Sequence, residues 1–217
     1  LAIRVSSAVA APHLVHQHAA AANLPAAAEA GPSSPLLLTT VAQVTNCTDP
    51  TDPGALAKAV LVVTRAVDVA TRAPPLSAQL QEAGGGLEIE TWSELPHGSG
   101  LGTSSILAAA LVAAVAAALG RTLTTTSLAH AVLKVEQRLT TGGGWQVQLG
   151  GMLGGAKLCT CRPMLPLHVE CEPLRLSEEC VQLLDGHLEL LYTGHVRQAK
   201  HLLRDVLRRW LLGRPQS

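Results

Sequence analysis

The sequence predicts an α+β fold, in which strands and helices pack in layers around a single core. Three observations support this class. Strand-like and helix-like segments are mixed along the chain without the regular βαβ order of a doubly wound parallel sheet. The 217 residues are 47% hydrophobic and 15% charged, which suits one well-packed domain. A glycine-rich turn also joins a strand-like run to an alanine-rich helix, as in many anion-binding sites.

The first third of the chain predicts two strands and one long helix. Residues 1–35 are rich in Ala, His and Pro, and we expect a frayed strand over 1–5 followed by a poorly defined segment. Alternating β-branched residues predict a strand over 36–44. The Asp-Pro-Thr-Asp-Pro-Gly cluster is typical of a turn, and an apolar stripe predicts a helix over 55–72.

The middle of the chain predicts a short helix over 76–82, a strand over 87–92 and two longer helices over 106–119 and 124–139. The last of these carries an apolar stripe that ends beside Glu136. An acidic side chain near a helix C-terminus opposes the helix dipole. We therefore interpret Glu136 as a functional residue, with a solvated surface acid as the alternative.

The last third predicts an antiparallel hairpin from strands over 152–161 and 167–171. A helix over 177–184, a strand over 188–192 and an amphipathic helix over 197–212 follow. The glycine run 142–144 has two open interpretations. It is either a flexible connection or a place where backbone approaches a substrate closely.

Composition excludes several classes of function. The formal net charge is zero and aromatic residues are 2% of the chain, so we expect no nucleic-acid partner. No apolar run is long enough to span a bilayer, and no secretory leader is evident, so we expect no membrane partner and a cytoplasmic protein. The five cysteines form no Cys-x-x-Cys pair, and we expect free thiols in a reducing compartment, with Cys159 and Cys161 buried on one strand face.

A glycine-rich segment between the strand over 87–92 and the helix over 106–119 predicts a phosphate site. Its glycines permit positive φ and close approach of a ligand, and its Thr-Ser-Ser end offers amides at a helix N-terminus. The segment matches neither a Walker loop nor the dinucleotide fingerprint. The alternative is a tight connection capped by a hydroxyl. The predicted phosphate-binding residues are Pro96, Gly98, Ser99, Gly100, Leu101, Gly102, Thr103, Ser104 and Ser105.

The pattern Pro-x-x-x-Gly-Leu-Gly-Ser/Thr-Ser resembles the ATP-binding loop of the GHMP small-molecule kinases. A second segment, Thr-Thr-Gly-Gly-Gly-Trp-Gln at 140–146 with Val-Glu-Gln at 135–137, resembles the kinase domains of the L-fucose kinase family. Bacterial heptose-phosphate kinases are similar more loosely. The resemblance is dense over 84–210. It implies ATP and Mg²⁺ as cofactors and phosphorylation of L-fucose to fucose 1-phosphate, a step of GDP-fucose salvage.

The resemblance also implies a layered GHMP kinase domain over 36–217, with its phosphate loop at 96–105. The family's first motif is not found in residues 1–35, and nothing after Trp210 resembles its third motif. We therefore expect a kinase domain that is incomplete at both ends. The oligomeric state is not predicted.

Site residues follow from the same resemblance. It places Mg²⁺ on Ser104 and Glu136, with Glu136 in the catalytic role. It places the sugar near Gly143, Gly144, Trp145 and Gln146. Where the family has the aspartate that serves as base, this chain has Val147. A non-catalytic product of a kinase gene, binding nucleotide or a partner, is therefore a second hypothesis, and a heptose-phosphate-type kinase is a third.

Overall fold

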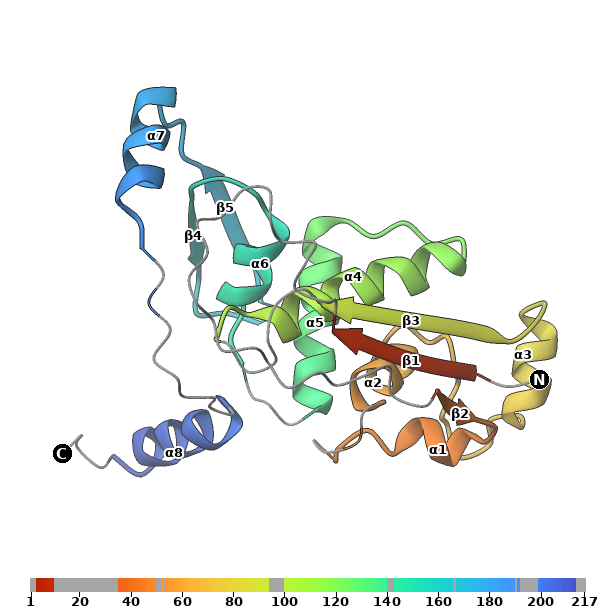
Figure 1. Cartoon of the computed structure of the whole chain (residues 1–217). Coiled ribbons are helices and arrows are strands. Elements are labelled where there is room, and N and C mark those ends of the chain that lie inside the picture. Colours follow the sequence, from red (N-terminus) through yellow and green to blue (C-terminus); the bar gives the residue numbers. More distant parts are fainter. Residues whose placement is uncertain are drawn as a thin grey trace.

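The computed structural model describes residues 3–9, 35–49, 52, 54–93, 100–139, 143–165, 167–189, 191 and 199–213. These residues form a mixed α/β architecture with two small sheets (Figure 1). In the larger sheet, β1 (Ile3–Val9) lies between β2 (Leu36–Leu38), which is antiparallel to it, and β3 (Leu87–Ser93), which is parallel. The pairing places β1 in one sheet with later parts of the chain. The proposed division at residue 35 stays a prediction.

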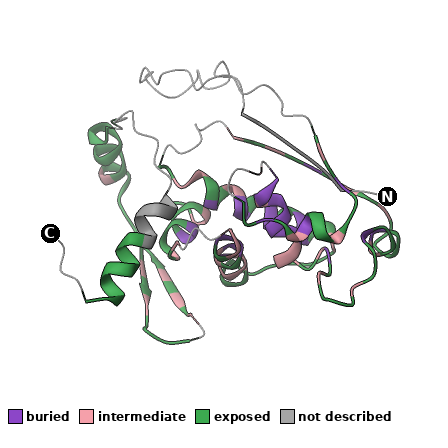
Figure 2. Ribbon diagram, turned by 90° about the horizontal axis from the view of Figure 1, so that it is seen from below, coloured by how far each residue is buried: buried purple, intermediate pink, exposed green. Residues whose placement is uncertain are grey.

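The core lies among three helices, α2 (Ala55–Val63), α4 (Thr103–Ala118) and α5 (Thr125–Arg138). Buried residues concentrate on these central helices (Figure 2). α4 has apolar residues on all sides, which suits a helix covered by neighbours on several faces. Core side chains with no exposed surface on these helices are Ala59, Val60, Leu61, Val112, Val132 and Val135, and Val44 of the segment after β2 is equally buried. The glycine-rich loop therefore leads into a helix of the core.

Two predicted elements before residue 75 are wrong in extent. The strand expected over 36–44 ends at Leu38, and α1 (Val41–Thr45) follows. Thr40 and Gln43 form a reciprocal capping box, so local side-chain capping overrides the β-branched pattern. The helix expected over 55–72 stops at Val63, two residues before Arg65 with φ of 55°. A non-glycine residue at positive φ cannot continue a right-handed helix.

The predictions that follow agree better with the structure. α3 (Leu76–Glu82) and β3 lie within one residue of their predicted bounds, and α4 and α5 begin and end within three. α7 (Glu178–His187) and α8 (Ala199–Leu211) are also present. The strand expected over 188–192 is wrong where it can be judged, since residues 188, 189 and 191 belong to no strand.

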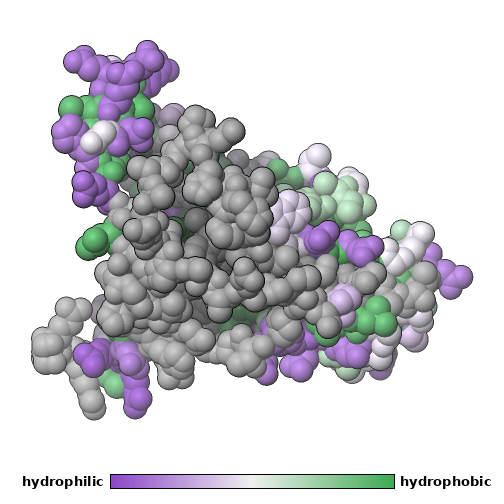
Figure 3. Space-filling model, in the orientation of Figure 1, coloured by the Kyte–Doolittle hydropathy of each residue, from purple (hydrophilic) through white to green (hydrophobic). Residues whose placement is uncertain are grey.

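α7 and α8 lie away from the helices of the core (Figure 1). α7 presents hydrophilic and hydrophobic side chains together on its surface (Figure 3). Val181 and Leu183 of α7 are 50% and 62% exposed, and Trp210 and Leu211 of α8 are 76% and 74% exposed, so the core covers these apolar side chains of neither helix. In the described part of the chain, no helix combines the length and apolar character that crossing a membrane requires.

Besides α1, a second helix was not predicted. α6 (Gln146–Met152) occupies the segment that we expected to connect a helix to a strand. Two glycines among its seven residues lower its intrinsic helix propensity. One of them, Gly151, lies against Ile106 of α4, where an added Cβ would be 2.4 Å from Ile106 Cγ1. Close packing on α4 thus accounts for a helix that local propensity does not favour.

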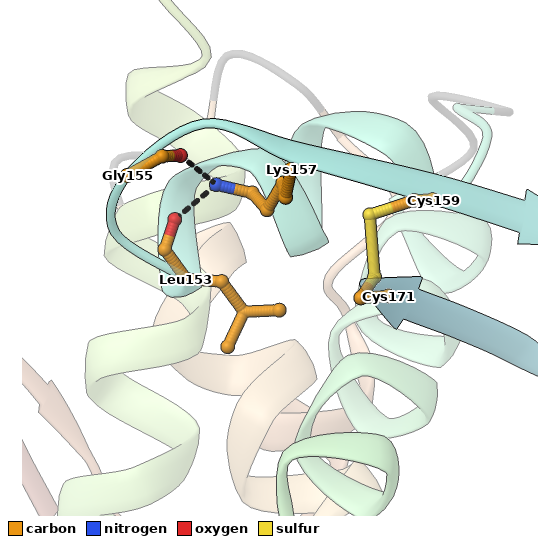
Figure 4. Close-up of a disulfide and its surroundings, with 5 residues drawn as sticks. All are labelled: Leu153, Gly155, Lys157, Cys159 and Cys171. Atoms are coloured by element: carbon orange, nitrogen blue, oxygen red, sulfur yellow. Dashed lines mark hydrogen bonds between the residues drawn. A yellow bond between two sulfur atoms is a disulfide. The ribbon is translucent and has the colours of Figure 1, made fainter. Parts of the chain in front are cut away.

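The predicted antiparallel pairing is confirmed by β4 (Lys157–Cys161) and β5 (Val169–Pro173). The predicted bounds are wrong, since β4 begins five residues later than expected and β5 lies two residues further along the chain. The prediction of free, buried thiols is wrong here. Cys159 faces Cys171 across the ladder with a Cα–Cα distance of 4.2 Å, and the two form a disulfide (Figure 4). Both are half-buried, as is Cys161 on the same strand face. Only the strand register brings the pair together, and the sequence does not give that register.

The start of this hairpin is tied to the end of α6. The Lys157 ammonium donates hydrogen bonds to the carbonyl oxygens of Leu153 and Gly155 (Figure 4). On α5, His130 Nε2 lies 2.8 Å from the carbonyl oxygen of Leu167, which can only accept, so this nitrogen carries the proton. These contacts connect the hairpin to α5 and α6, the helices that carry the candidate site.

Candidate phosphate and metal site

The described part of the glycine-rich loop ends in two left-handed glycines. Gly100 has φ of 79° and Gly102 has φ of 73°. Gly102 is the N-cap of α4 and has no side chain to cap the helix. The first turn of α4 contains no acidic residue, so its positive dipole end is not compensated from within the helix. Pro96, Gly98 and Ser99 lie outside the described residues.

The three hydroxyl residues that follow Gly102 have different surroundings. Thr103 Oγ1 is buried and has no hydrogen-bond partner among the described residues. Ser104 is exposed, and Ser105 is buried with its hydroxyl donating to Glu136 Oε1. None of the three caps the helix, which argues against the alternative of a simple hydroxyl-capped connection. The amides at the start of α4 remain suited to an anion.

Glu136 is held by residues from two other helices. Its side chain projects from the last turns of α5 and is 8% exposed. Ser105 of α4 donates to Oε1, and Gln148 Nε2 of α6 donates to Oε2 at 2.7 Å. The structure thus places Glu136 against the start of α4, and its roles in metal binding and catalysis stay a prediction. The hydroxyl that contacts the carboxylate is that of Ser105, whereas the resemblance implied Ser104 as the hydroxyl that binds Mg²⁺ together with Glu136.

Burial raises the pKa of the Glu136 carboxyl above its ordinary value of 4.5, and the hydrogen bonds from Ser105 and Gln148 offset part of that rise. Ionising this carboxyl in its buried site therefore costs more free energy than it does in water. Such a group at the junction of three helices is typical of a functional position. A cation beside it would favour the ionised form.

The raised pKa predicts a pH-dependent stability. Between 4.5 and the raised value, the folded protein binds more protons at Glu136 than the unfolded chain does. The free energy of unfolding contributed by this group therefore falls as pH rises through that window, and is constant above it. Urea titrations from pH 4.5 upward should show wild type losing stability relative to Glu136→Gln. A difference between the two that does not change with pH would contradict this account.

One residue of the segment expected to bind sugar, Gly143, lies beside the Glu136 carboxylate. A Cβ on Gly143 would lie 2.6 Å from Glu136 Oε2, so Gly143 backbone contacts the acid directly. Gly144 lies against Gln146, the exposed first residue of α6. Trp145 is half-buried and lines a small apolar hollow with His130 of α5 and residues of the hairpin. A sugar-binding role for these four residues stays a prediction.

Val147 lies where the phosphate loop meets α6. A Cβ on Gly102 would be 2.6 Å from Val147 Cγ1, and the Val147 side chain is 47% exposed. The position therefore faces the N-terminus of α4 and retains access to solvent. A side chain here is well placed to act on a group bound at the loop, but valine offers no proton acceptor.

Gly102→Ala is expected to destabilise the protein. Alanine at φ of 73° is strained by about 1–2 kcal/mol, and its Cβ would also press on Val147. Gly150→Ala on α6 is the matched control, because nothing lies within 4 Å of its added Cβ. Chemical denaturation should show a loss for Gly102→Ala and no loss for Gly150→Ala. Equal stabilities would show that the left-handed cap is not required.

The residues around Glu136 fit a magnesium ion. Oxygen donors are the ligands that Mg²⁺ prefers, and it retains waters and substrate phosphate oxygens in most sites. The Glu136 carboxylate and the Ser105 hydroxyl are oxygen ligands in contact with each other, and the buried, unpartnered Thr103 Oγ1 lies two residues before Ser105 on α4. Among the described residues no group of three or more His, Cys, Asp and Glu side chains could hold a metal. Phosphate oxygens would therefore have to complete the coordination.

The part of the chain that contains these residues matches a known protein family. Residues 62–155 match the model of the GHMP kinases N terminal domain, a range that contains α4, α5, α6 and the loop before them. Over these residues the chain is similar to a GHMP kinase N-terminal domain. The matched range begins inside α2 and ends before β4. It therefore includes Ser105, Glu136 and Gln148, which are joined by hydrogen bonds.

The chain is also similar to two proteins whose names identify them as fucokinases. It is 41% identical over 126 residues to a bifunctional fucokinase/GDP-fucose pyrophosphorylase of Arabidopsis thaliana, which covers 58% of the chain and 12% of the relative. It is 38% identical over 141 residues to an L-fucokinase/L-fucose-1-P guanylyltransferase of Bacteroides fragilis, covering 61% and 14%. The matches thus span about one eighth of the length of these relatives. No solved structure matches the chain.

Proposed function

We propose that this chain supplies the nucleotide-phosphate and metal site of an ATP-dependent sugar kinase, with L-fucose as acceptor and fucose 1-phosphate as product. The observation that carries the proposal is the Ser105–Glu136 hydrogen bond, which joins the start of α4 to a buried acid. The names of the two fucokinase relatives support the choice of sugar. A cytoplasmic site of action belongs to the same proposal.

The proposed roles follow from the needs of phosphoryl transfer, which depends on positioning and on neutralising charge. The amides at Gly102–Ser104 would hold phosphate oxygens at the helix N-terminus. Glu136, with Ser104 or Ser105, would hold Mg²⁺, which when bound neutralises charge on the phosphates. Gly143, next to Glu136, would bring the sugar-binding segment to the same place. Pro96, Gly98 and Ser99 are proposed as the outer part of the phosphate loop by resemblance alone.

A second function is favoured by Val147. With no proton acceptor at this position, the chain would bind nucleotide without efficient transfer to a sugar. A positioned base is worth about 10²- to 10⁴-fold in rate. The loose transition state of phosphoryl transfer leaves the rest of the rate to positioning and charge neutralisation. A nucleotide-binding protein with weak or no kinase activity is therefore the alternative to an active fucose kinase.

Isothermal titration with a non-hydrolysable ATP analogue tests the part that both functions share. We expect binding that Mg²⁺ strengthens and that Ser105→Ala weakens. Incubation with ATP and L-fucose, followed by detection of fucose 1-phosphate, then separates the kinase from the non-catalytic protein. A folded sample that binds no nucleotide, with or without Mg²⁺, would remove both.

A further inference from the structure

Gln148 has the most completely buried polar side chain in the described part of the molecule. The proposed function gives it no role. Its side chain is 1% exposed and projects from α6 toward α5. Its amide nitrogen donates to Glu136 Oε2 at 2.7 Å, while Ser105 holds the other carboxylate oxygen. One donor, Ser105 of α4, precedes Glu136 in the sequence, and the other, Gln148 of α6, follows it.

The Gln148 amide is poorly satisfied for a residue that serves stability alone. Its oxygen, Oε1, is buried without a hydrogen-bond partner among the described residues. Burying an unpaired carbonyl has a cost, and replacing polar core pairs by apolar residues of similar volume is often neutral or stabilising. The amide orientation is nevertheless determined by the acid, because the oxygen in place of Nε2 would repel the carboxylate.

We propose that Gln148 is a positioning residue that orients the Glu136 carboxylate for metal binding. This inference rests on the proposed function, in which Glu136 is a metal ligand. With Ser105 on Oε1 and Gln148 on Oε2, rotation of the carboxylate about its last torsion breaks a hydrogen bond in either direction. The acid therefore presents its lone pairs in one orientation.

The same contact links the metal acid to the proposed sugar-binding segment. Gln148 follows Val147 on α6, and Gly143 just before the helix touches Glu136 Oε2, the oxygen that Gln148 also holds. A displacement of α6 would thus turn the carboxylate. Partners that orient a metal ligand in this way contribute about 10- to 100-fold to metal affinity.

Gln148→Met tests the proposal, because methionine keeps the volume of the side chain and removes the donor. Gln137→Met is the matched control, since Gln137 is exposed on α5 beside Glu136. Mn²⁺ would be the probe, with its binding followed by electron paramagnetic resonance in the presence of a non-hydrolysable ATP analogue. Calorimetry without metal would report nucleotide affinity separately, and thermal unfolding would report stability.

We expect Gln148→Met to lower Mn²⁺ affinity by about 10- to 100-fold while metal-free nucleotide affinity stays within about twofold. Gln137→Met should leave both unchanged. If Gln148→Met is poorly folded, Gln148→Asn retains a buried amide one methylene too short to reach Glu136, and the same loss is expected. Unchanged Mn²⁺ affinity in a folded variant at this position would overturn the inference alone. A wild type that binds neither Mn²⁺ nor nucleotide would overturn the proposed function as well.

Discussion

Val147→Asp is expected to raise the rate of fucose phosphorylation by about 10²- to 10⁴-fold, the usual contribution of a positioned general base. The position is suitable because Val147 lies against Gly102 at the start of α4 and is 47% exposed. The substitution should also fold, since an acidic residue in the first turn of α6 interacts favourably with the helix dipole. The measurement is formation of fucose 1-phosphate from ATP and L-fucose at saturating Mg²⁺.

Val147→Asn is the matched control for that prediction. Asparagine has the shape of aspartate and its hydrogen-bonding oxygen but does not act as a base at neutral pH. We expect Val147→Asn to turn over at the rate of wild type. Equal rates for all three proteins would mean that position 147 does not limit the reaction. Equal gains for the two variants would assign the effect to hydrogen bonding in place of proton transfer.

Glu136→Gln is expected to abolish the effect of Mg²⁺ on nucleotide binding. Among the described residues, the buried Glu136 carboxylate accepts a hydrogen bond from Ser105 in the first turn of α4. Its loss should reduce metal affinity by at least the 10- to 100-fold typical for removing a group that supports a metal ligand. Calorimetric titration of the ATP analogue with and without Mg²⁺ would measure the change.

The stability of Glu136→Gln distinguishes a lost ligand from a damaged fold. Burial makes the charged carboxylate costly, so the neutral amide should leave stability at pH 7 unchanged or raised. Rotation of the Gln148 amide would let its Oε1, now without a partner, accept from the new side chain. A large loss of stability in Glu136→Gln would instead make Glu136 a structural residue. Retained Mg²⁺ dependence would remove it from the metal site.

Several features of the candidate site could be predicted from the sequence alone. The glycine-rich turn, the helix after it and the choice of Glu136 as a candidate follow from local rules, namely glycine conformation, helix periodicity and an acid at an unfavourable helix end. These local rules do not predict which serine hydroxyl contacts Glu136. Ser104 and Ser105 are adjacent and chemically alike, and only the rotation of α4 about its axis directs Ser105 inward to Glu136.

The elements that local rules missed are those whose stability comes from distant contacts. α6 contains two glycines and forms because Gly151 and Val147 pack against α4. Gln148 gave no signal in the sequence, since a glutamine reveals its burial only when a neighbouring helix covers it. The Cys159–Cys171 pair depends in the same way on the register of β4 with β5.

The amino-acid sequence by itself determined the order of strand, glycine-rich turn and helix, because glycine conformation and helix periodicity are local properties of the chain, and this order is what an anion site at a helix N-terminus needs. The tertiary structure alone decided which side chains share the site, because α4, α5 and α6 meet there from positions up to 43 residues apart, from Ser105 to Gln148. Packing between helices sets which face of each one turns inward, and that choice cannot be read from any single segment.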